Sequence, residues 1–256
     1  MDIHETAIID SKAEIGKNVK IGPYSVIESD VIIGDDCEIS SSVLIASGTR
    51  IGKKCRVFHG AVLRTIPQDL KFKGEITTLE IGENTTIREF ATLNRGTEDK
   101  WKTVVGNNCL LMAYSHTAHD CHLGNNVIIA NSVNMAGHVE IDDFVGIGGL
   151  CPVHQFVRLG KHAFIGGGSK ISKDVPPFVL AMGEPFRYAG LNRVGLSRRG
   201  FSESTMAKIK DAYRIIFQSK LMIKDALEKV KDEIELIQEV KDILQFFQDS
   251  DRGVIR

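Results

Sequence analysis

Aliphatic residues recur at every sixth position over the first two-thirds of this chain. From Ile3 to Ile171, 25 of the 29 positions spaced by six are Ile, Leu, Val or Met. A period of six fits neither the 3.6-residue α-helix nor an alternating β-strand. It fits short strands joined by tight turns, so the pattern predicts a parallel β-helix, in which three six-residue sides make an 18-residue coil.

A second inward-facing position lies four residues after each aliphatic one and carries small side chains. All five cysteines fall on it: Cys37, Cys55, Cys109, Cys121 and Cys151. Buried thiols behave as small hydrophobic groups and are poor nucleophiles, so we expect neither a disulfide framework nor a catalytic cysteine. Gly, Asn and Asp often follow the aliphatic residue, as in "GNN" at 106–108 and 124–126. These residues are expected to supply the backbone angles of the turns.

The repeat also predicts how the chain is divided. The β-helix is expected over residues 1–178, with loops at 64–80 and 94–104 where the period breaks. It is expected to end near "DVPPF" at 174–178, because two prolines cannot continue a paired strand. A linker follows over 179–200. Apolar residues at helical spacing then predict a C-terminal α-helical domain over 201–256.

Composition narrows the class of protein. The net charge is −1, which does not favour nucleic-acid binding. No run of 18 apolar residues is present that could cross a membrane, and the N-terminal residues lack the pattern of a secretory signal. With its scattered cysteines, the chain is expected to be cytoplasmic.

The segment "SHTAHDCHLG" at 115–124 carries the candidate chemistry. None of its histidines falls on an inward position, and His138 lies 18 residues after Asp120, one coil further on. We therefore expect His116, His119, Asp120 and His138 to converge on one outward-facing patch. The flat faces of such a coil also suit packing about a three-fold axis, which would enclose the patch between subunits.

Two chemistries fit this patch. A zinc site would take His116, His119 or His138 as ligands, as in the hexapeptide-repeat carbonic anhydrases, if they converge on one point. Alternatively, His119 would act as a general base supported by Asp120. A trimeric scaffold without catalytic activity is a third hypothesis, and an N-acyltransferase a fourth.

Five further motifs accompany the repeat: "HTAHDC" at 116–121, "AGHV" at 136–139, "VHQF" at 153–156, "DVPPF" at 174–178 and "GLNRVGLSRRGFS" at 190–202. Together they resemble the acyl-carrier-protein-dependent UDP-N-acetylglucosamine O-acyltransferases, which begin lipid A biosynthesis. The resemblance covers nearly the whole chain. It implies a left-handed β-helix, a homotrimer with active sites between subunits, and acyl carrier protein and a UDP-sugar as partners. It implies no metal and no cofactor beyond the phosphopantetheine that carries the acyl group.

The same resemblance implies roles for individual residues. His119 would be the general base for the sugar 3-hydroxyl, Asp120 would support it, and the N–H of Gly137 would stabilise the oxyanion. Residues expected to contact the substrates are Gln68, Asp69, Lys71, His116, His138, His154 and Gln155, with Asn192, Arg198 and Arg199 at the uridine and phosphates. Gly167 and Lys170 are expected to set the length of the acyl chain. His122 is expected to be a surface residue.

Overall fold

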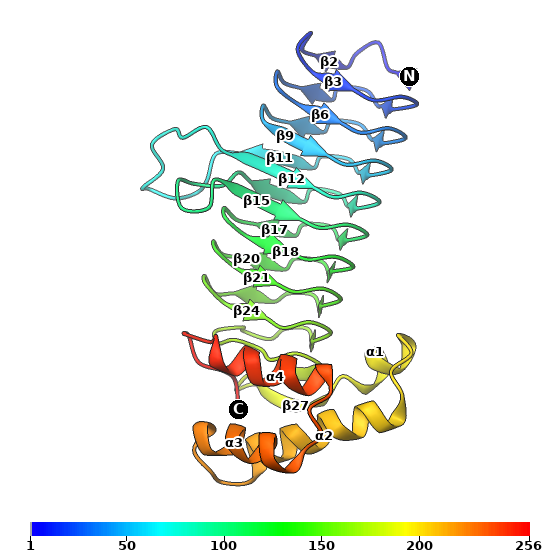
Figure 1. Cartoon of the computed structure of the whole chain (residues 1–256). Coiled ribbons are helices and arrows are strands. Elements are labelled where there is room, and N and C mark those ends of the chain that lie inside the picture. The colour runs from blue at the N-terminus through cyan, green and yellow to red at the C-terminus, as the bar shows by residue number, and fades with distance from the viewer. Residues whose placement is uncertain (1) are drawn as a thin grey trace.

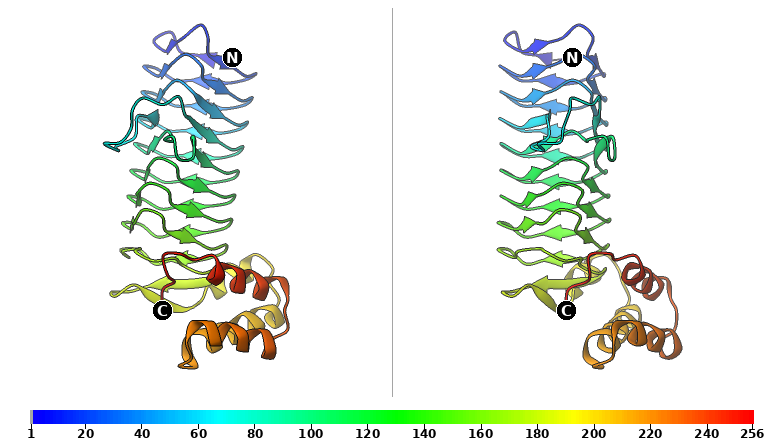
Figure 2. Two further views of the ribbon diagram at one scale, coloured as in Figure 1. Left: turned by 60° about the vertical axis from the view of Figure 1, so that its left-hand side comes forward. Right: turned by 90° about the vertical axis from the view of Figure 1, so that its left-hand side faces the viewer.

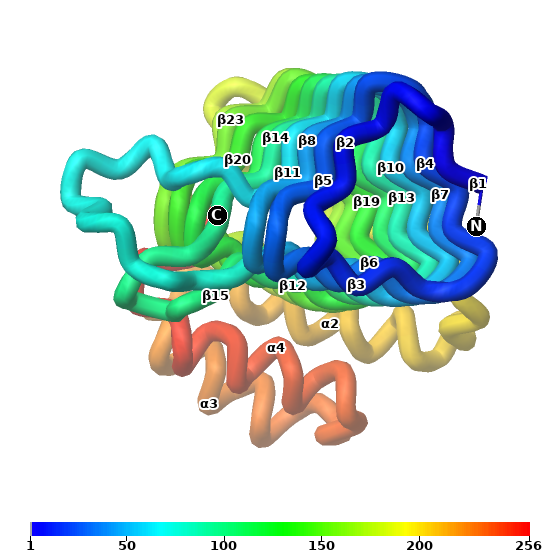
Figure 3. The backbone as a smooth tube through the Cα atoms, turned by 90° about the horizontal axis from the view of Figure 1, so that it is seen from above, coloured from blue at the N-terminus to red at the C-terminus, as the bar shows by residue number. Residues whose placement is uncertain are grey.

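The computed structural model describes residues 2–256, and most of them form a solenoid of triangular cross-section (Figures 1 and 3). Except where the two loops are inserted, successive coils pair in parallel with an offset of 18 residues, as in Asp2 with Lys20 and His116 with Asn134. In Figure 3, the chain runs anticlockwise from β1 to β2 to β3 while receding from the viewer, which is a left-handed winding. The predicted left-handed parallel β-helix is confirmed.

The strands stack into three sheets, one for each face of the prism. The first face contains β1 (Asp2–Ile3), β4 (Lys20–Ile21), β7 (Glu38–Ile39), β10 (Arg56–Val57), β13 (Thr86–Ile87), β16 (Leu110–Leu111), β19 (Ile128–Ile129), β22 (Gly146–Ile147), β25 (Phe164–Ile165), β26 (Val179–Met182) and β27 (Arg187–Leu191). The second face contains β2 (Ile8–Ile9), β5 (Val26–Ile27), β8 (Leu44–Ile45), β11 (Val62–Thr65), β14 (Thr92–Asn94), β17 (His116–Thr117), β20 (Asn134–Met135) and β23 (Pro152–Val153). The third face contains β3 (Glu14–Ile15), β6 (Ile32–Ile33), β9 (Thr49–Ile51), β12 (Thr78–Ile81), β15 (Lys102–Val105), β18 (His122–Leu123), β21 (Glu140–Ile141) and β24 (Arg158–Leu159).

The interior of the solenoid is built from the two inward positions that the sequence predicts. Aliphatic residues such as Leu93 and Ile129 are fully buried, and so is Thr117, one of the exceptions to the repeat. All five cysteines are free and buried. Burial raises the pKa of the Cys121 thiol to about 12, so this residue stays an uncharged part of the core. The expectation of structural cysteines is confirmed.

The glycines that follow the aliphatic residues do not supply the backbone angles of the corners, contrary to the prediction. At most corners one residue has a positive φ, and it is often Asn or Asp, as at Asn126 and Asp36, but also His138 and Phe156. The glycines that follow the aliphatic residues have another function. A Cβ at Gly34 would lie 2.8 Å from the backbone carbon of Gly52 in the next coil. These glycines are therefore required by the close approach of neighbouring coils and not by the angles of the turns.

Two loops leave the solenoid at one corner (Figures 1 and 3). The first loop covers residues 66–77, between β11 and β12, and the second covers 95–101, between β14 and β15. Both are shorter than the predicted ranges 64–80 and 94–104. The reason is that the flanking residues stay paired, Thr65 with Asn94 and Thr78 with Lys102. The six-residue repeat lapses in these strands, but their hydrogen bonding continues.

The region after the prolines is more regular than predicted. Val179 begins β26, which pairs in parallel with β25 and antiparallel with β27. The first face thus continues past residue 178, because Pro176 and Pro177 lie at a corner, where no ladder hydrogen bond is required of them. The predicted linker over 179–200 contains these two strands and a short helix, α1 (Arg193–Arg198).

Three further helices close the chain: α2 (Glu203–Gln218), α3 (Ile223–Glu233) and α4 (Gln238–Gln248). They lie beside the last coils, below the third face in the view of Figure 3 and to one side in Figure 2. The fully buried Tyr213 of α2 donates a hydrogen bond of 2.6 Å to the carbonyl of Pro177. Within residues 2–256, no helix is long and apolar enough to cross a membrane.

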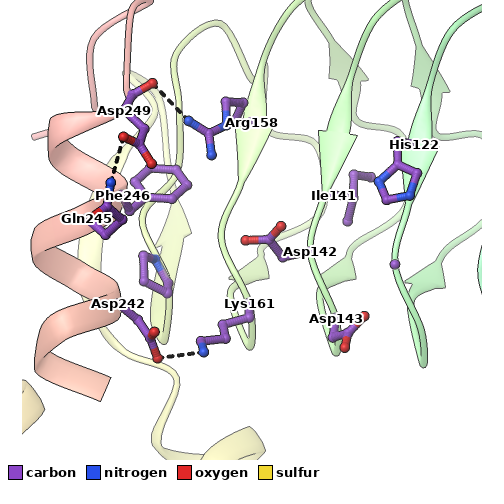
Figure 4. A pocket seen from close by; sticks show the side chains of 12 residues that line it. His122, Ile141, Asp142, Asp143, Arg158, Lys161, Asp242, Gln245, Phe246 and Asp249 are labelled. Atoms are coloured by element: carbon purple, nitrogen blue, oxygen red, sulfur yellow. Dashed lines mark hydrogen bonds and ion pairs between the residues drawn. The ribbon is translucent and has the colours of Figure 1, made fainter. Parts of the chain in front are cut away.

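Helix α4 borders a groove on the third face (Figure 4). Lys161 forms an ion pair of 2.5 Å with Asp242 of α4, and the Arg158 guanidinium donates to the carbonyl of Asp249. His122 lines this groove from β18 and is exposed. The groove is thus a polar junction between the solenoid and the helices, and its lining includes His122 but neither His119 nor Asp120.

Candidate active site

The candidate catalytic residues lie at the corner between the second and third faces, which we call the third corner. His116 is in β17, and the turn that follows carries His119 and Asp120 before β18 begins. Asp120 has a φ of 59°, and His138 has one of 62° at the same position one coil later. The 18-residue repeat therefore places the two side chains next to each other, as predicted, with His138 Nε2 3.9 Å from Asp120 Oδ2.

Asp120 is completely buried, contrary to the expected outward-facing patch. Thr97 of the second loop covers it and donates twice: its backbone N–H to Oδ1 at 2.8 Å and its hydroxyl to Oδ2 at 2.6 Å. The Asp120 N–H donates to the hydroxyl of Thr103. The loop that interrupts the repeat thus encloses the carboxylate, a function that the repeat alone does not indicate.

The hydrogen bonds of Asp120 fix its charge and the orientation of His119. Burial by itself would raise the pKa of Asp120, but the bonds from His119 and Thr97 and the nearby His138 outweigh it and lower the pKa to about 2. The ionised carboxylate can only accept, so His119 Nδ1, 2.8 Å from Oδ2, must carry the hydrogen. His119 Nε2 is then the unprotonated nitrogen of the neutral ring, and no group within residues 2–256 forms a hydrogen bond with it.

Gly137 lies against the ring of His119. A Cβ at this position would lie 2.5 Å from Cε1 and 2.7 Å from Nε2 of the imidazole. Any side chain would therefore displace His119 or cover its free nitrogen. Among the hydrogen bonds of residues 2–256, the Gly137 N–H has no acceptor. The glycine leaves open space and a free donor next to Nε2.

His138 borders the same space from the next coil. Its ring is perpendicular to that of His119 at a centroid distance of 5.0 Å, and it stacks on Phe156 at 4.5 Å. Its Nδ1 lies 3.1 Å from a carboxylate oxygen of Asp99, although the alignment is not that of a hydrogen bond. Burial lowers the pKa of His138, although the Asp120 carboxylate opposes this effect. His138 is therefore neutral at pH 7.

His116 faces outward from the second face, where its Nδ1 forms a hydrogen bond of 2.7 Å with the hydroxyl of Thr92. Burial, and then the neighbouring His119, lower the pKa of His116, so it is also neutral at pH 7. His116 therefore lies in a strand of the second face, whereas His119 and Asp120 lie in the turn at the corner.

The first loop brings two of its three predicted residues to the third corner. Asp69 and Lys71 line a cavity with Phe72 and Glu75 of that loop, with Thr97, Glu98 and Asp99 of the second loop, and with His138 and Phe156. Gln68 is exposed and does not line this cavity. The first loop therefore lies next to His138 at the third corner, and its contact with substrate stays a prediction.

The next coil and the C-terminal tail supply another part of this surface. His154 and Gln155 are exposed, and Arg252 lies 2.9 Å from His154 Nδ1. Arg252 also lines a cavity with His138 and Phe156. The tail thus reaches the third corner, which the sequence analysis did not predict.

The three predicted nucleotide-binding residues are at a different corner of the chain. Asn192 uses its side chain inside the fold, accepting from the Gly195 N–H and donating to the carbonyl of His162. Arg199 lies 5.1 Å from the ring of Phe144, which has the positive φ of the corner between the third and first faces. Arg198 is exposed next to it. Within one chain, these residues are therefore separated from His119 by a face of the prism.

The residues predicted to set acyl-chain length lie at or next to the second face, beyond its last strand. Gly167 lies in the turn before that face, where a Cβ would be 3.2 Å from the Gly149 carbonyl oxygen. Lys170 is exposed, and the pairing of Val153 with Ile171 puts it in the outward row of His116. Three coils at about 4.8 Å each separate Lys170 from His116, a distance of about 14 Å along the axis.

Three potential metal ligands, His119, Asp120 and His138, lie within 4.8 Å of one another. Their spacing fits hydrogen bonding better than coordination. Two ligands of a tetrahedral zinc ion with bonds of about 2.0–2.1 Å are about 3.3 Å apart. His119 Nδ1 and Asp120 Oδ2 are 2.8 Å apart, and Oδ2 also accepts from Thr97. His116 is not part of the cluster.

Sequence reasoning missed four residues of this site: Thr97, Asp99, Phe156 and Arg252. One signal was available for Phe156, which lies 18 residues after His138 and therefore stacks on it. The other three are on a loop and on the tail, outside the period. Their positions depend on backbone paths that the repeat does not specify.

Comparison with known proteins is consistent with the fold. The sequence profile of the bacterial transferase hexapeptide (six repeats) matches residues 12–47 and 102–137. The profile of UDP-N-acetylglucosamine O-acyltransferase, domain 2, matches residues 174–255. A solenoid of hexapeptide repeats followed by this C-terminal segment defines a hexapeptide-repeat acyltransferase.

Full-length relatives make the assignment more specific. The acyl-[acyl-carrier-protein]–UDP-N-acetylglucosamine O-acyltransferase of Thiobacillus denitrificans is 49% identical over 255 residues, 99% of each chain. That of Thermodesulfovibrio yellowstonii is 48% identical, covering 100% of this chain and 99% of the relative. A UDP-N-acetylglucosamine acyltransferase structure from Bacteroides fragilis superimposes with a TM-score of 0.98 at 48% identity, covering 99% of each chain. The chain belongs to the family of acyl-[acyl-carrier-protein]–UDP-N-acetylglucosamine O-acyltransferases.

Proposed function

We propose that this acyltransferase moves a 3-hydroxyacyl group from the phosphopantetheine thioester of acyl carrier protein to the 3-position of UDP-N-acetylglucosamine, the first step of lipid A biosynthesis. The single observation that carries the proposal is the His119–Asp120 pair, in which Asp120 holds Nδ1 and leaves Nε2 free beside Gly137. The activity of the related acyltransferases indicates the donor and the acceptor.

In the proposed mechanism, His119 Nε2 removes the proton of the acceptor hydroxyl while that oxygen attacks the thioester carbonyl carbon. The tetrahedral intermediate carries an oxyanion, which accepts a hydrogen bond from the Gly137 N–H. Collapse of the intermediate breaks the C–S bond, and the leaving thiolate takes the proton from His119 Nε2. Asp120 stabilises the imidazolium ion that exists between the two transfers.

Replacing Gly137 with alanine is expected to lower kcat/KM by about 10²-fold or more, because a Cβ at 2.7 Å from His119 Nε2 displaces the base. The folded solenoid should persist, since the displaced atoms belong to a side chain at the surface of the cavity. Steady-state kinetics with circular dichroism as the folding control measure this effect. Full activity in a folded Gly137→Ala variant would show that His119 is not placed as proposed.

We further propose that the complete site forms between subunits of a homotrimer. Asp69, Lys71, His116, His138, His154 and Gln155 would hold the sugar and acyl ends at the third corner of one subunit, with Gln68 approaching as substrate binds. Arg198 and Arg199, with Asn192 setting the start of α1, would bind the nucleotide from the neighbouring subunit. The separation of these two groups on one chain supports this arrangement, because one subunit alone holds only half of the site.

Gly167 and Lys170 are proposed to determine the length of the acyl chain. An acyl chain that starts at the third corner and follows the outward row of the second face reaches Lys170 after about 14 Å. Replacing Lys170 with glycine is expected to shift the preference toward longer chains. Acyl transfer across a series of chain lengths measures this, and an unchanged profile would contradict the assignment.

The alternative function is that of a zinc enzyme of the hexapeptide-repeat carbonic anhydrase type, favoured by the clustering of His119, Asp120 and His138. The acyltransferase mechanism requires no metal. We therefore expect acyl transfer to be unchanged after dialysis against EDTA, with substoichiometric zinc by elemental analysis. One zinc per subunit, together with loss of activity on chelation and recovery on addition of zinc, would favour the alternative.

The direct test of the proposed function is mass spectrometry of the reaction product. The purified protein is incubated with a 3-hydroxyacyl-[acyl carrier protein] and either UDP-N-acetylglucosamine or its 3-amino analogue. A product whose mass equals that of the acceptor plus the acyl group, less water, is expected with at least one acceptor. The ratio of the two rates assigns the 3-hydroxyl or the 3-amine, and no product with either acceptor would contradict the proposal.

A further inference from the structure

Residues 94–97, with the sequence "NRGT", lie at the base of the first loop and lead into the second. The N–H of Arg95 donates to the carbonyl of Thr65, where the first loop departs, at 3.2 Å. The N–H of Gly96 donates to the carbonyl of Thr78, where that loop returns, at 3.3 Å. The backbone of this segment therefore joins both ends of the first loop.

The side chains of Asn94 and Arg95 extend the connection into the loop. Asn94, which is 2% exposed, donates to the hydroxyl of Thr65 and the carbonyl of Ile66. Arg95 donates from Nε to the Thr77 hydroxyl at 2.8 Å and from Nη2 to the Glu75 carbonyl. Arginine offers several donors in a fixed planar arrangement, which suits holding two separate acceptors.

The aromatic ring of Phe72 makes the connection to the cavity. The Arg95 guanidinium lies 5.2 Å from the centroid of this ring, within the range of a cation–π interaction. Phe72 lines the cavity together with Asp69 and Lys71. The position of Arg95 therefore influences where the two polar residues of the loop are held.

Gly96 packs closely against the backbone of Lys102, so no side chain fits at this position. A Cβ at this residue would lie 2.3 Å from the backbone nitrogen of Lys102. The Gly96 carbonyl also accepts a hydrogen bond of 2.6 Å from Thr77. The next residue is Thr97, whose N–H and hydroxyl both bind the buried Asp120 carboxylate. The same four residues thus contact the first loop and the partner of the proposed base.

We propose that residues 94–97 form a positioning segment that holds the first loop and Asp120 in one fixed relation, with Arg95 acting on the loop and Thr97 on Asp120. Neither is a catalytic residue, because each acts through another group. The kinetic consequences rest on the proposed function. The substrate-binding loop and the His119–Asp120 pair are then ordered together, so that acceptor binding and base orientation depend on the same four residues.

The anchoring of the loop is tested without any activity assay. Lys71 and Lys73 are exposed in the first loop and are trypsin sites. Full-length Arg95→Met, which keeps an apolar side chain over Phe72, is expected to be cut there at least tenfold faster than the wild type. The matched control is Arg88→Met, because Arg88 also lies over a phenylalanine, Phe58, but pairs with Glu89. Equal cleavage of Arg95→Met and wild type overturns the anchoring.

Kinetics test the two arms of the segment separately. Arg95→Met is expected to raise the KM for UDP-N-acetylglucosamine about tenfold with a smaller change in kcat. Thr97→Val removes the hydroxyl bond to Asp120 while keeping the shape, leaving a more basic carboxylate that stabilises imidazolium. The acid limb of the kcat/KM profile should therefore move to higher pH, and Thr97→Ser should restore it.

A purely structural role would lower the melting temperature without moving that limb. An unmoved limb in Thr97→Val, or an unchanged KM in Arg95→Met, would overturn the corresponding arm. Absence of acyl transfer in the wild type would instead refute the proposed function, and the proteolysis result would still decide whether Arg95 anchors the loop.

Discussion

Replacing His119 with alanine is expected to reduce kcat/KM for acyl transfer by about 10²–10⁴-fold, the range that a positioned general base contributes. The expectation follows from the ring's tautomer. Asp120 accepts from Nδ1, so Nε2 is the basic nitrogen that faces the open space beside Gly137. Steady-state kinetics with saturating acyl carrier protein substrate measure the loss, and the KM for the acceptor should change much less than kcat.

The matched control for this variant is His122→Ala. His122 lies three residues further along, on the third face, and is exposed toward the groove beside α4 (Figure 4). Its replacement should leave kcat within about twofold of the wild type. Because loss of His119 exposes Asp120, His119→Gln serves as a second variant that fills the space. Substantial acyl transfer by folded His119→Ala and His119→Gln would show that another group is the base.

Replacing Asp120 with asparagine is expected to reduce kcat on the order of 10³-fold with little effect on folding. The amide can still accept from the Thr97 N–H, but its NH₂ group would face His119 Nδ1. A donor at this position makes Nδ1 the acceptor and puts the hydrogen on Nε2, which then cannot take a proton from the acceptor hydroxyl. Tautomer inversion therefore removes the base while leaving the ring in place.

The matched control for Asp120→Asn is Asp36→Asn, at a corner residue with the same backbone conformation. Asp36 has the same left-handed backbone as Asp120, with a φ of 60°, and is far from the loops. Asp36→Asn should retain the wild-type kcat and melting temperature. If Asp120→Asn remains active while its melting temperature is unchanged, Asp120 does not control the tautomer of His119.

The sequence predicts the solenoid because the determinants of this fold are local and periodic. A coil needs one aliphatic residue, one small residue and a tight turn on each side, and neighbouring coils repeat this requirement. The prediction that the solenoid ends near Pro176 and Pro177 was wrong, because it assumed that both prolines lie in a paired strand. There the corner tolerates residues that a paired strand would reject, and the first face continues through β26.

The candidate site was only partly predictable for the same reason. The 18-residue offset places His138 beside Asp120 without any structural information. It does not indicate that Asp120 is buried, because burial comes from Thr97 on a loop outside the period. It also does not reveal that Arg252 of the tail reaches His154, since that contact joins residues 98 positions apart. The repeat thus predicts the solenoid backbone and the stacking of its corner residues. The contacts made by the loops and the tail cannot be predicted from it.

The central claim is that His119, oriented by Asp120, is the base in acyl transfer, and the pH dependence of kcat/KM tests it most directly. His119→Ala leaves the other titratable groups of the third corner in place: Asp120, whose pKa is about 2, and His116 and His138, whose pKa values burial lowers. A lost limb in this variant therefore reports on His119 itself. The account predicts that wild-type kcat/KM falls tenfold per pH unit on the acid side, and that the residual rate of His119→Ala lacks this limb. The same limb at the same midpoint in His119→Ala would contradict the account.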